Sequence, residues 1–128
     1  MRSYKEFKCN FRHEDYLGIN NHSHRVALCK LRISAHTLAI ERGRYTRPIT
    51  PLEERTCKHC HANKIEDEEH FLLECPKYDK SRESLLQKVS VMCNHFDELC
   101  QRDKFIYLLS GGMEVAKLVA AFAYENMP

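Results

Sequence analysis

The chain has 128 residues, seven cysteines and a formal net charge of +2. A chain of this length can bury one modest core, and its small net charge gives by itself no signal for nucleic-acid binding. No apolar run reaches the length that crosses a membrane, so we expect no membrane partner. The odd number of cysteines and the lack of a recognisable signal peptide predict free thiols in a reducing intracellular compartment, nuclear or cytoplasmic.

The N-terminal third begins with a polar segment and continues into a helical pattern. Residues 1–22 are polar and irregular, and we expect them to form a loosely ordered arm. Apolar side chains then recur at helical spacing from Ser23, a favourable N-cap, to the stop signal Gly43. This pattern predicts one helix over residues 23–41, and His36 in its apolar stripe is expected to be an ordinary core histidine.

A basic segment and a short acidic helix follow. Residues 43–56 contain two prolines, which exclude a long helix and favour extended backbone. Asp67 is placed to cap a short helix that ends at Glu74, with acidic residues near its positive end. The proline after Cys75 favours extended backbone at that cysteine and ends the helix before it.

The last third predicts three more helices from its apolar spacing and glycine stops. They open at Pro76 or Asp79, at residue 98 and at residue 113. No strand-like alternation is long enough to predict a sheet. We therefore predict an all-α fold in which residues 23–128 form a small helical domain. Within it, residues 57–76 form a zinc-stapled insert made of a Cys-x2-Cys knuckle and a short helix.

The insert carries a metal-ligand pattern with the spacing C-x2-C-x9-H-x4-C, formed by Cys57, Cys60, His70 and Cys75. Two ligand pairs one loop apart are typical of a tetrahedral Zn²⁺ site, and four protein ligands leave no position for a catalytic water. We therefore expect a structural site and no enzyme activity. The cysteines could instead be buried apolar residues or a redox pair. His59 and His61 compete with His70 as nitrogen ligand, but each would close a very small ring with Cys60.

Four runs of the chain carry a wider pattern: Leu31–His36, Ile40–Tyr45, Glu54–Cys60 and Ile65–Tyr78. Together they resemble the Cys-Cys-His-Cys zinc-binding region that follows the reverse transcriptase in LINE-type (non-LTR) retrotransposon proteins. The resemblance covers roughly residues 28–85 and is most specific around the cysteines. It implies the same four zinc ligands and contact with RNA or DNA, with a reverse transcriptase domain of the same element as a further partner.

The same comparison also sets limits. The paired-aspartate motif of a reverse transcriptase is missing from the sequence. Some members of that family carry an endonuclease with two acidic residues and a lysine. Here Asp79, Glu83 and Lys88 have those charges, but they lie on one amphipathic helix, where contacts with solvent and with one another are expected.

The predicted nucleic-acid face is the basic segment that leads into the knuckle. Arginines contact phosphates and an aromatic ring stacks on an unpaired base, so the residues expected to bind RNA or DNA are Arg42, Arg44, Tyr45, Arg47 and Arg55. The alternative is a solvated basic linker that pairs with the acidic residues at 66–69. In that case the domain is a structural or protein-interaction zinc module that binds no nucleic acid.

Overall fold

The structure is a computed structural model that describes residues 18–110 and 112–127. These residues form helices and turns, and in place of a sheet they contain one isolated antiparallel bridge, between Thr56 and Ile65. The predicted all-α fold is confirmed for this part of the chain. The α-helices are α2 (His22–Arg32), α3 (Ala39–Arg42), α4 (Asp79–Met92), α5 (Gln101–Ser110) and α6 (Met113–Asn126). The shorter turns are η2 (Leu52–Glu54), η3 (His70–Glu74), η4 (Pro76–Tyr78) and η5 (Phe96–Glu98).

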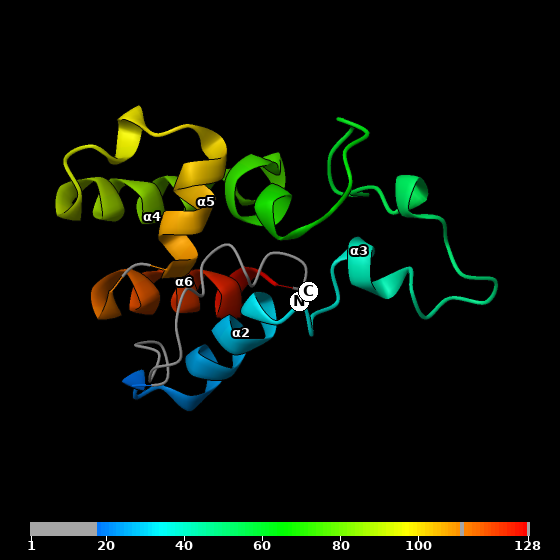
Figure 1. The fold of residues 1–128 in the computed structure, drawn as a ribbon, viewed down its shortest axis with the longest axis horizontal. Helices are drawn as coiled ribbons and strands as arrows, with labels where there is room; N and C mark the ends of the chain where they lie inside the picture. The colour runs from blue at the N-terminus through cyan, green and yellow to red at the C-terminus, as the bar shows by residue number, and fades with distance from the viewer. Residues whose placement is uncertain (1–17, 111, 128) are drawn as a thin grey trace.

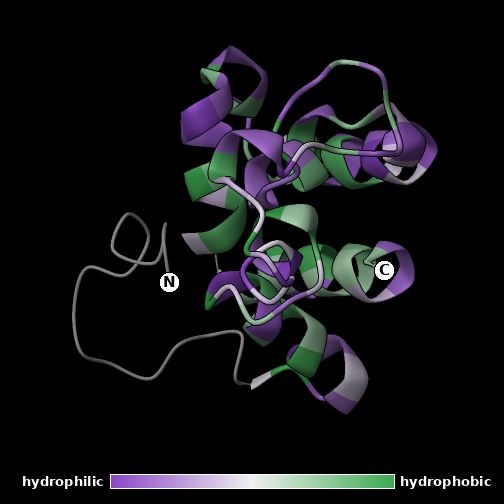
Figure 2. Cartoon of the chain, turned by 90° about the vertical axis from the view of Figure 1, so that its right-hand side faces the viewer, coloured by the Kyte–Doolittle hydropathy of each residue, from purple (hydrophilic) through white to green (hydrophobic). Residues whose placement is uncertain are grey.

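Helix α6 is the centre of the fold. It packs against α2 on one side and against α4 and α5 on the other (Figure 1). Val119, Ala120 and Ala123 are fully buried, and the two alanines let neighbouring helices approach closely. Hydrophobic residues concentrate where the helices meet, and hydrophilic residues cover the outside (Figure 2).

The metal-ligand insert shares this core. Phe71 of η3 is fully buried, and its ring lies 5.3 Å from that of Phe122 on α6 and 5.0 Å from that of Tyr78. Leu72 is buried as well. The insert therefore contributes large apolar side chains to the domain core and is not attached to it by the metal ligands alone.

The prediction of one long helix over residues 23–41 is wrong, because the observed helix is shorter. Helix α2 begins one residue before Ser23, because the side chain of Asn21 accepts a hydrogen bond from the His24 N–H at 3.1 Å. It ends at Arg32, and Ser34 adopts a positive φ of 62°. The Ala35 N–H then donates to the Lys30 carbonyl at 2.8 Å. This bond, between residues five apart, closes a Schellman motif.

Tertiary contacts explain why the helix breaks there. Ser34 Oγ donates to Glu68 Oε1 at 2.8 Å, and His36 Nε2 lies 2.9 Å from the same oxygen. His36 Nδ1 accepts from the Leu38 N–H at 3.3 Å, so the ring is satisfied on both sides. The expectation that His36 is a buried structural histidine is confirmed. In a continuous helix Ser34 and His36 would lie on different faces, because residues two apart are rotated by about 200°. Both side chains can reach Glu68 only because the helix ends before them.

The acidic residues at 66–69 are part of this arrangement. Glu66 and Glu68 are only 2% and 5% exposed, and Glu66 Oε1 accepts from the Ala39 N–H at 2.7 Å. These carboxylates therefore hold the chain that leads into α3. The pairing of the 43–56 segment with these acids, expected for a solvated linker, stays a prediction.

The last three helices lie close to their predicted ranges, with one break. Helix α4 opens at Asp79, one of its two predicted starts, and ends at Met92, because the backbone is extended at Cys93. Met92 is consequently 48% exposed, whereas Phe96 is buried from η5. Within the described residues no single helix is long and apolar enough to cross a membrane; α5 and α6 satisfy those criteria only when taken together.

The predicted N-terminal arm, residues 1–22, lies mostly outside the described residues. Its last part is docked, because Ile19 is 3% exposed and its carbonyl accepts from Arg25 Nη1 at 2.8 Å. The division into an arm and a domain at residue 23 stays a prediction.

Candidate metal centre

Cys57, Cys60, His70 and Cys75 are brought together in the fold. Their ligand atoms all lie within 4.8 Å of one another. A tetrahedral zinc ion with Zn–S of about 2.3 Å and Zn–N of about 2.0–2.1 Å requires S–S edges of about 3.8 Å and S–N edges of about 3.6 Å. The Cys57 and Cys75 sulfurs are 3.7 Å apart, and Cys60 Sγ is 3.5 Å from His70 Nε2. These two separations match the edges of such a site, and the group could hold one metal ion.

The three thiols of the cluster are free. A disulfide would require sulfurs about 2.0 Å apart, well below the separation of Cys57 and Cys75. The cluster is also buried, since Cys57, Cys60 and Cys75 are 5%, 8% and 0% exposed. Soft sulfur donors that converge in a dry site are a favourable environment for a borderline-soft cation.

The knuckle is built by a short antiparallel turn. The Cys57 N–H bonds the Lys64 carbonyl at 2.8 Å next to the Thr56–Ile65 bridge, and Asn63 adopts the positive φ of 54° that the turn needs. Backbone N–H groups of His59 and Cys60 point at Cys57 Sγ. These donors orient the first sulfur of the pair and favour its thiolate form.

The second ligand pair sits on a π-helical turn. Asp67 caps this turn as predicted, because its Oδ1 accepts from the His70 N–H at 2.8 Å. The Cys75 N–H bonds the His70 carbonyl at 2.8 Å, and Cys75 itself is extended. The prediction that helical geometry ends before Cys75 is confirmed. The turn is wider than the expected α-helix, because its hydrogen bonds join residues five apart. The bond from Cys75 to His70 therefore places these two residues one above the other, on the same side of the turn.

Arg82 fixes the end of that turn, a role that the sequence analysis missed. The guanidinium is buried and donates to three carbonyl oxygens of the turn: Leu72 at 2.8 Å, Phe71 at 3.1 Å and Cys75 at 2.8 Å. Its remaining nitrogen donates to Asp79 Oδ1 at 2.7 Å. A buried arginine can be inferred from sequence only if its partners are known, and backbone carbonyls leave no sequence signal.

Burial and neighbouring acids oppose ionisation of Cys57 in the absence of a metal. Burial raises the pKa of the Cys57 thiol to about 12 against the opposing effect of the two backbone donors. The nearby Cys75 thiol and the Glu66 carboxyl, whose Oε2 lies 3.4 Å from Cys57 Sγ, raise it further. The two backbone donors do not outweigh burial, so the thiol keeps its proton without a metal and metal binding at this site must displace it.

His59 and His61 are not part of the cluster. Both are exposed, and His59 lies between Glu66 Oε2 at 3.7 Å and Lys77 Nζ at 3.4 Å. The structure thus brings His70 to the sulfurs and leaves the two competing histidines outside.

The basic segment is a closed loop, so the expected extended conformation is wrong. The Thr50 N–H bonds the Gly43 carbonyl at 3.1 Å, and Thr46 Oγ1 bonds both the Gly43 carbonyl and the Thr50 side chain.

Residues 43–50, which we call the basic loop, project from the helical body (Figure 1). Gly43 is required by a close approach, since a Cβ there would lie 2.7 Å from Arg55 Cγ.

The five predicted nucleic-acid contacts do not share one role. Arg55 donates to the carbonyls of Thr50 and Ile40, both at 2.9 Å, and so supports the base of the loop. Arg44 pairs with Glu41 at 3.1 Å, although its side chain remains 56% exposed.

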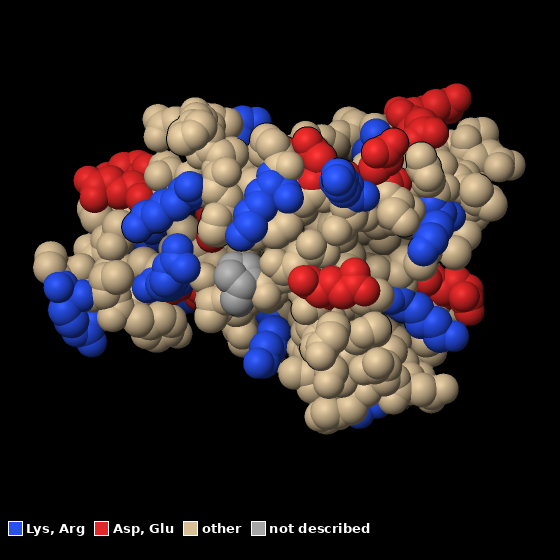
Figure 3. Space-filling model, turned by 180° about the vertical axis from the view of Figure 1, so that it is seen from behind, with Lys and Arg blue, Asp and Glu red and all other residues tan. Residues whose placement is uncertain are grey.

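The other three predicted contacts are more open. Arg42 and Arg47 make only long bonds, both of 3.4 Å, to the carbonyls of Thr37 and Thr46. Tyr45 is 77% exposed. On the face seen in Figure 3, basic side chains lie near the end formed by the basic loop, on the left, with acidic ones between them.

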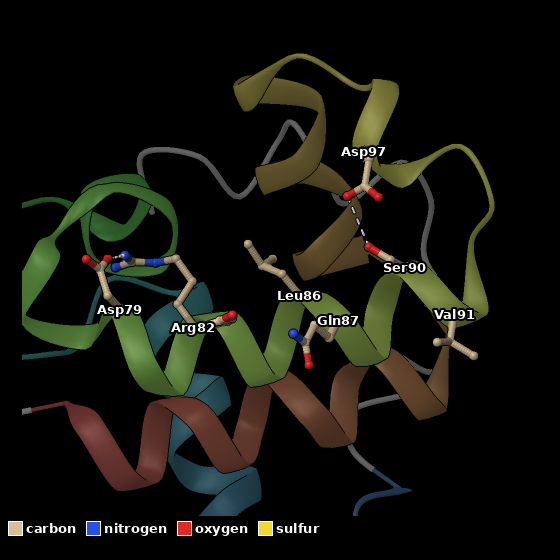
Figure 4. A pocket seen from close by; sticks show the side chains of 8 residues that line it. Asp79, Arg82, Leu86, Gln87, Ser90, Val91 and Asp97 are labelled. Carbon is tan, nitrogen blue, oxygen red and sulfur yellow. Dashed lines mark hydrogen bonds and ion pairs between the residues drawn. The ribbon is translucent and has the colours of Figure 1, made fainter.

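The three residues with nuclease-like charges do not form a site. Asp79 and Glu83 line an open groove of about 770 Å³ on α4, in which Asp79 is paired with Arg82 (Figure 4). Lys88 lines a different groove, between α4 and α6. The structure therefore keeps the lysine apart from the two acids.

No protein family, curated protein or solved structure matched this chain in the three comparisons.

Proposed function

We propose that this domain binds one Zn²⁺ ion through Cys57, Cys60, His70 and Cys75. The observation that carries the proposal is the match between two ligand separations, Cys57 Sγ to Cys75 Sγ and Cys60 Sγ to His70 Nε2, and the edges of a zinc-centred tetrahedron. Three thiolates and an imidazole favour zinc over magnesium or calcium, which prefer oxygen ligands. The ion would hold the knuckle and the π-turn together, and with four protein ligands its role is structural.

Native mass spectrometry with and without a chelator tests the metal site. The wild-type chain is expected to carry one zinc, and Cys60→Ser and Cys75→Ser should each abolish stoichiometric binding. Cys100→Ser is the matched control, because Cys100 is exposed and outside the cluster, and it should keep the metal. Full zinc occupancy in both cluster variants at neutral pH would disprove the ligand assignment.

We further propose that the domain is a nucleic-acid-binding module of retrotransposon reverse transcriptase origin. Two features support this: the resemblance of the cysteine-histidine region, and the exposed Arg44, Tyr45 and Arg47 on a loop with an internally bonded backbone. Such a loop presents charge to phosphates and a ring to unpaired bases at little entropic cost. Arg55 supports the loop from inside.

Salt-dependent binding to single-stranded RNA and DNA tests this second proposal. Each arginine that contacts a phosphate contributes about 0.7–0.9 to the slope of log affinity against log salt, so Arg44→Ala with Arg47→Ala should flatten it by about 1.4–1.8. Tyr45→Ala should weaken binding by about 1–3 kcal/mol if the ring stacks on a base. The matched control replaces Lys80 and Lys88, two exposed lysines of α4, and should leave the slope unchanged.

A different result would favour the alternative function. No binding by the wild type at low salt, or equal slopes for the loop variant and the lysine control, would identify the basic loop as a solvated linker. The domain would then be a structural or protein-interaction zinc module. Its exposed Tyr45, Ile49 and Leu52 are the side chains available for such contacts.

A further inference from the structure

One side of the His70 ring is left unsatisfied in the buried cluster. His70 is 2% exposed, and its Nε2 faces Cys60 Sγ. Its Nδ1 is buried and has no hydrogen-bond partner. The carboxylate Oε2 of Glu74 lies 3.6 Å from Nδ1, just beyond hydrogen-bond distance. An unpaired polar atom in a buried site is costly, so this pair is placed to act together.

Glu74 is held at this position by two other segments. Lys64, just before the bridge residue Ile65, donates to Oε2 at 2.6 Å, and Gln101, the first residue of α5, donates to Oε1 at 2.8 Å. The Glu74 carboxylate is thus ion-paired with Lys64 and accepts a hydrogen bond at each oxygen. It joins the knuckle, the π-turn and α5.

We propose that Glu74 is a positioning residue for the metal, and that through Gln101 it links metal occupancy to the docking of α5. This inference rests on the proposed zinc site. A neutral imidazole that offers Nε2 to a cation carries its proton on Nδ1. A carboxylate that accepts this proton fixes the tautomer and the ring orientation, and it makes the ligating nitrogen more basic.

The chemistry of the three partners explains why a carboxylate is required. His70 Nδ1–H, Lys64 and Gln101 are all donors, and a carboxylate offers only acceptors. A glutamine at position 74 can keep its amide oxygen towards His70 and Lys64 only if its NH₂ group faces Gln101, whose amide must then turn its own oxygen inward. Glu74→Gln therefore keeps the size of the side chain and removes its charge and its fit to the present donors.

Glu69 supplies a matched control on the same turn. It is the residue next to His70, and its Oε2 lies 3.3 Å from Arg102 Nη1 on α5. Glu69→Gln makes the same chemical change between the same two segments. Its carboxylate pairs with Arg102, whereas Glu74 faces the His70 ring, so Glu69→Gln should not affect the metal through the imidazole.

Competition with a chromophoric chelator measures the Zn²⁺ affinity of the full chain. We expect Glu74→Gln to weaken binding by about 10–100-fold and Gln101→Ala by a smaller factor, with Glu69→Gln within about twofold of wild type. The absorption spectrum of the Co²⁺-substituted protein should show all four ligands retained in each variant. In the metal-free wild type, ¹⁵N NMR should find the His70 proton on Nδ1, and Glu74→Gln should shift it towards Nε2.

Two outcomes would overturn the inference while leaving the zinc site in place. One is equal Zn²⁺ affinity of wild type and Glu74→Gln. The other is an equal loss in Glu69→Gln, which would indicate general weakening of the turn. If Glu74→Gln does not fold, Gln101→Ala decides, because it keeps every ligand and Glu74 itself. A wild type that binds no zinc would refute the proposed metal site and the inference together.

Discussion

Replacing Arg82 with methionine should destabilise the domain and weaken its metal site together. Methionine keeps most of the apolar stem of the side chain and removes the guanidinium. Three carbonyl oxygens at the end of the π-turn, those of Phe71, Leu72 and Cys75, then lose their donor. Since Cys75 is one of the proposed ligands, the loss acts directly on the position of its sulfur.

The expected size follows from two opposing effects. Hydrogen bonds from a charged donor contribute about 1.5–3 kcal/mol each, so three of them represent a large gross loss. Burial lowers the pKa of Arg82, which shows that desolvating this charge is unfavourable even with Asp79 beside it. Removing the charge recovers part of the loss, and we expect a net decrease of about 3 kcal/mol in the free energy of unfolding. That is a large share of the roughly 5–15 kcal/mol typical of a domain.

Urea denaturation of the zinc-loaded protein, followed by circular dichroism, measures this change. Lys80→Met on the same helix is the matched control, because Lys80 is exposed, and it should change the stability by less than about 0.5 kcal/mol. The reasoning is refuted if Arg82→Met costs less than about 1 kcal/mol and leaves Zn²⁺ affinity unchanged. In that case the carbonyls would find other donors, and Arg82 would not hold the turn.

Further expectations concern the metal and the core. Zinc binding should release at least one proton per ion near neutral pH, because the raised pKa of Cys57 keeps this thiol protonated without metal; affinity should therefore fall as pH falls, and calorimetry in buffers of different ionisation enthalpy would count the protons. Phe71→Ala should lower the free energy of unfolding by about 3–5 kcal/mol, measured in urea, because the ring is fully buried against Phe122. Removal of zinc should reduce amide protection in α6 as well as in residues 57–76, since the two share a core; protection lost only within 57–76 would instead support a separable insert.

The sequence by itself determined the composition of the candidate metal site. The spacing of Cys57, Cys60, His70 and Cys75 is a local pattern, and a knuckle and a short capped turn can be inferred from nearby residues alone. The all-α character and the approximate starts of the later helices were equally predictable. Each depends on apolar periodicity and on glycine or proline signals within the helix itself.

Only the tertiary structure decided where the long N-terminal helix breaks. Ser34 and His36 carry no local stop signal, and helical spacing continues through them. Their partner Glu68 is distant in the sequence, and two buried hydrogen bonds to it outweigh the preference for continuing the helix. The same reason applies to Glu66, which looked like a solvated acid and is buried against the Ala39 N–H.

The surroundings of the metal ligands also required the fold. Sequence names the four ligands, but the groups that orient them are Arg82, which donates to backbone carbonyls, and Glu74, which meets Gln101 of α5. The role of Arg55 was mispredicted for the same reason. The sequence indicates a surface charge for nucleic acid, whereas in the fold Arg55 donates to backbone carbonyls at the base of the loop. Backbone acceptors have no residue identity, so contacts made to them become visible only when the chain is folded.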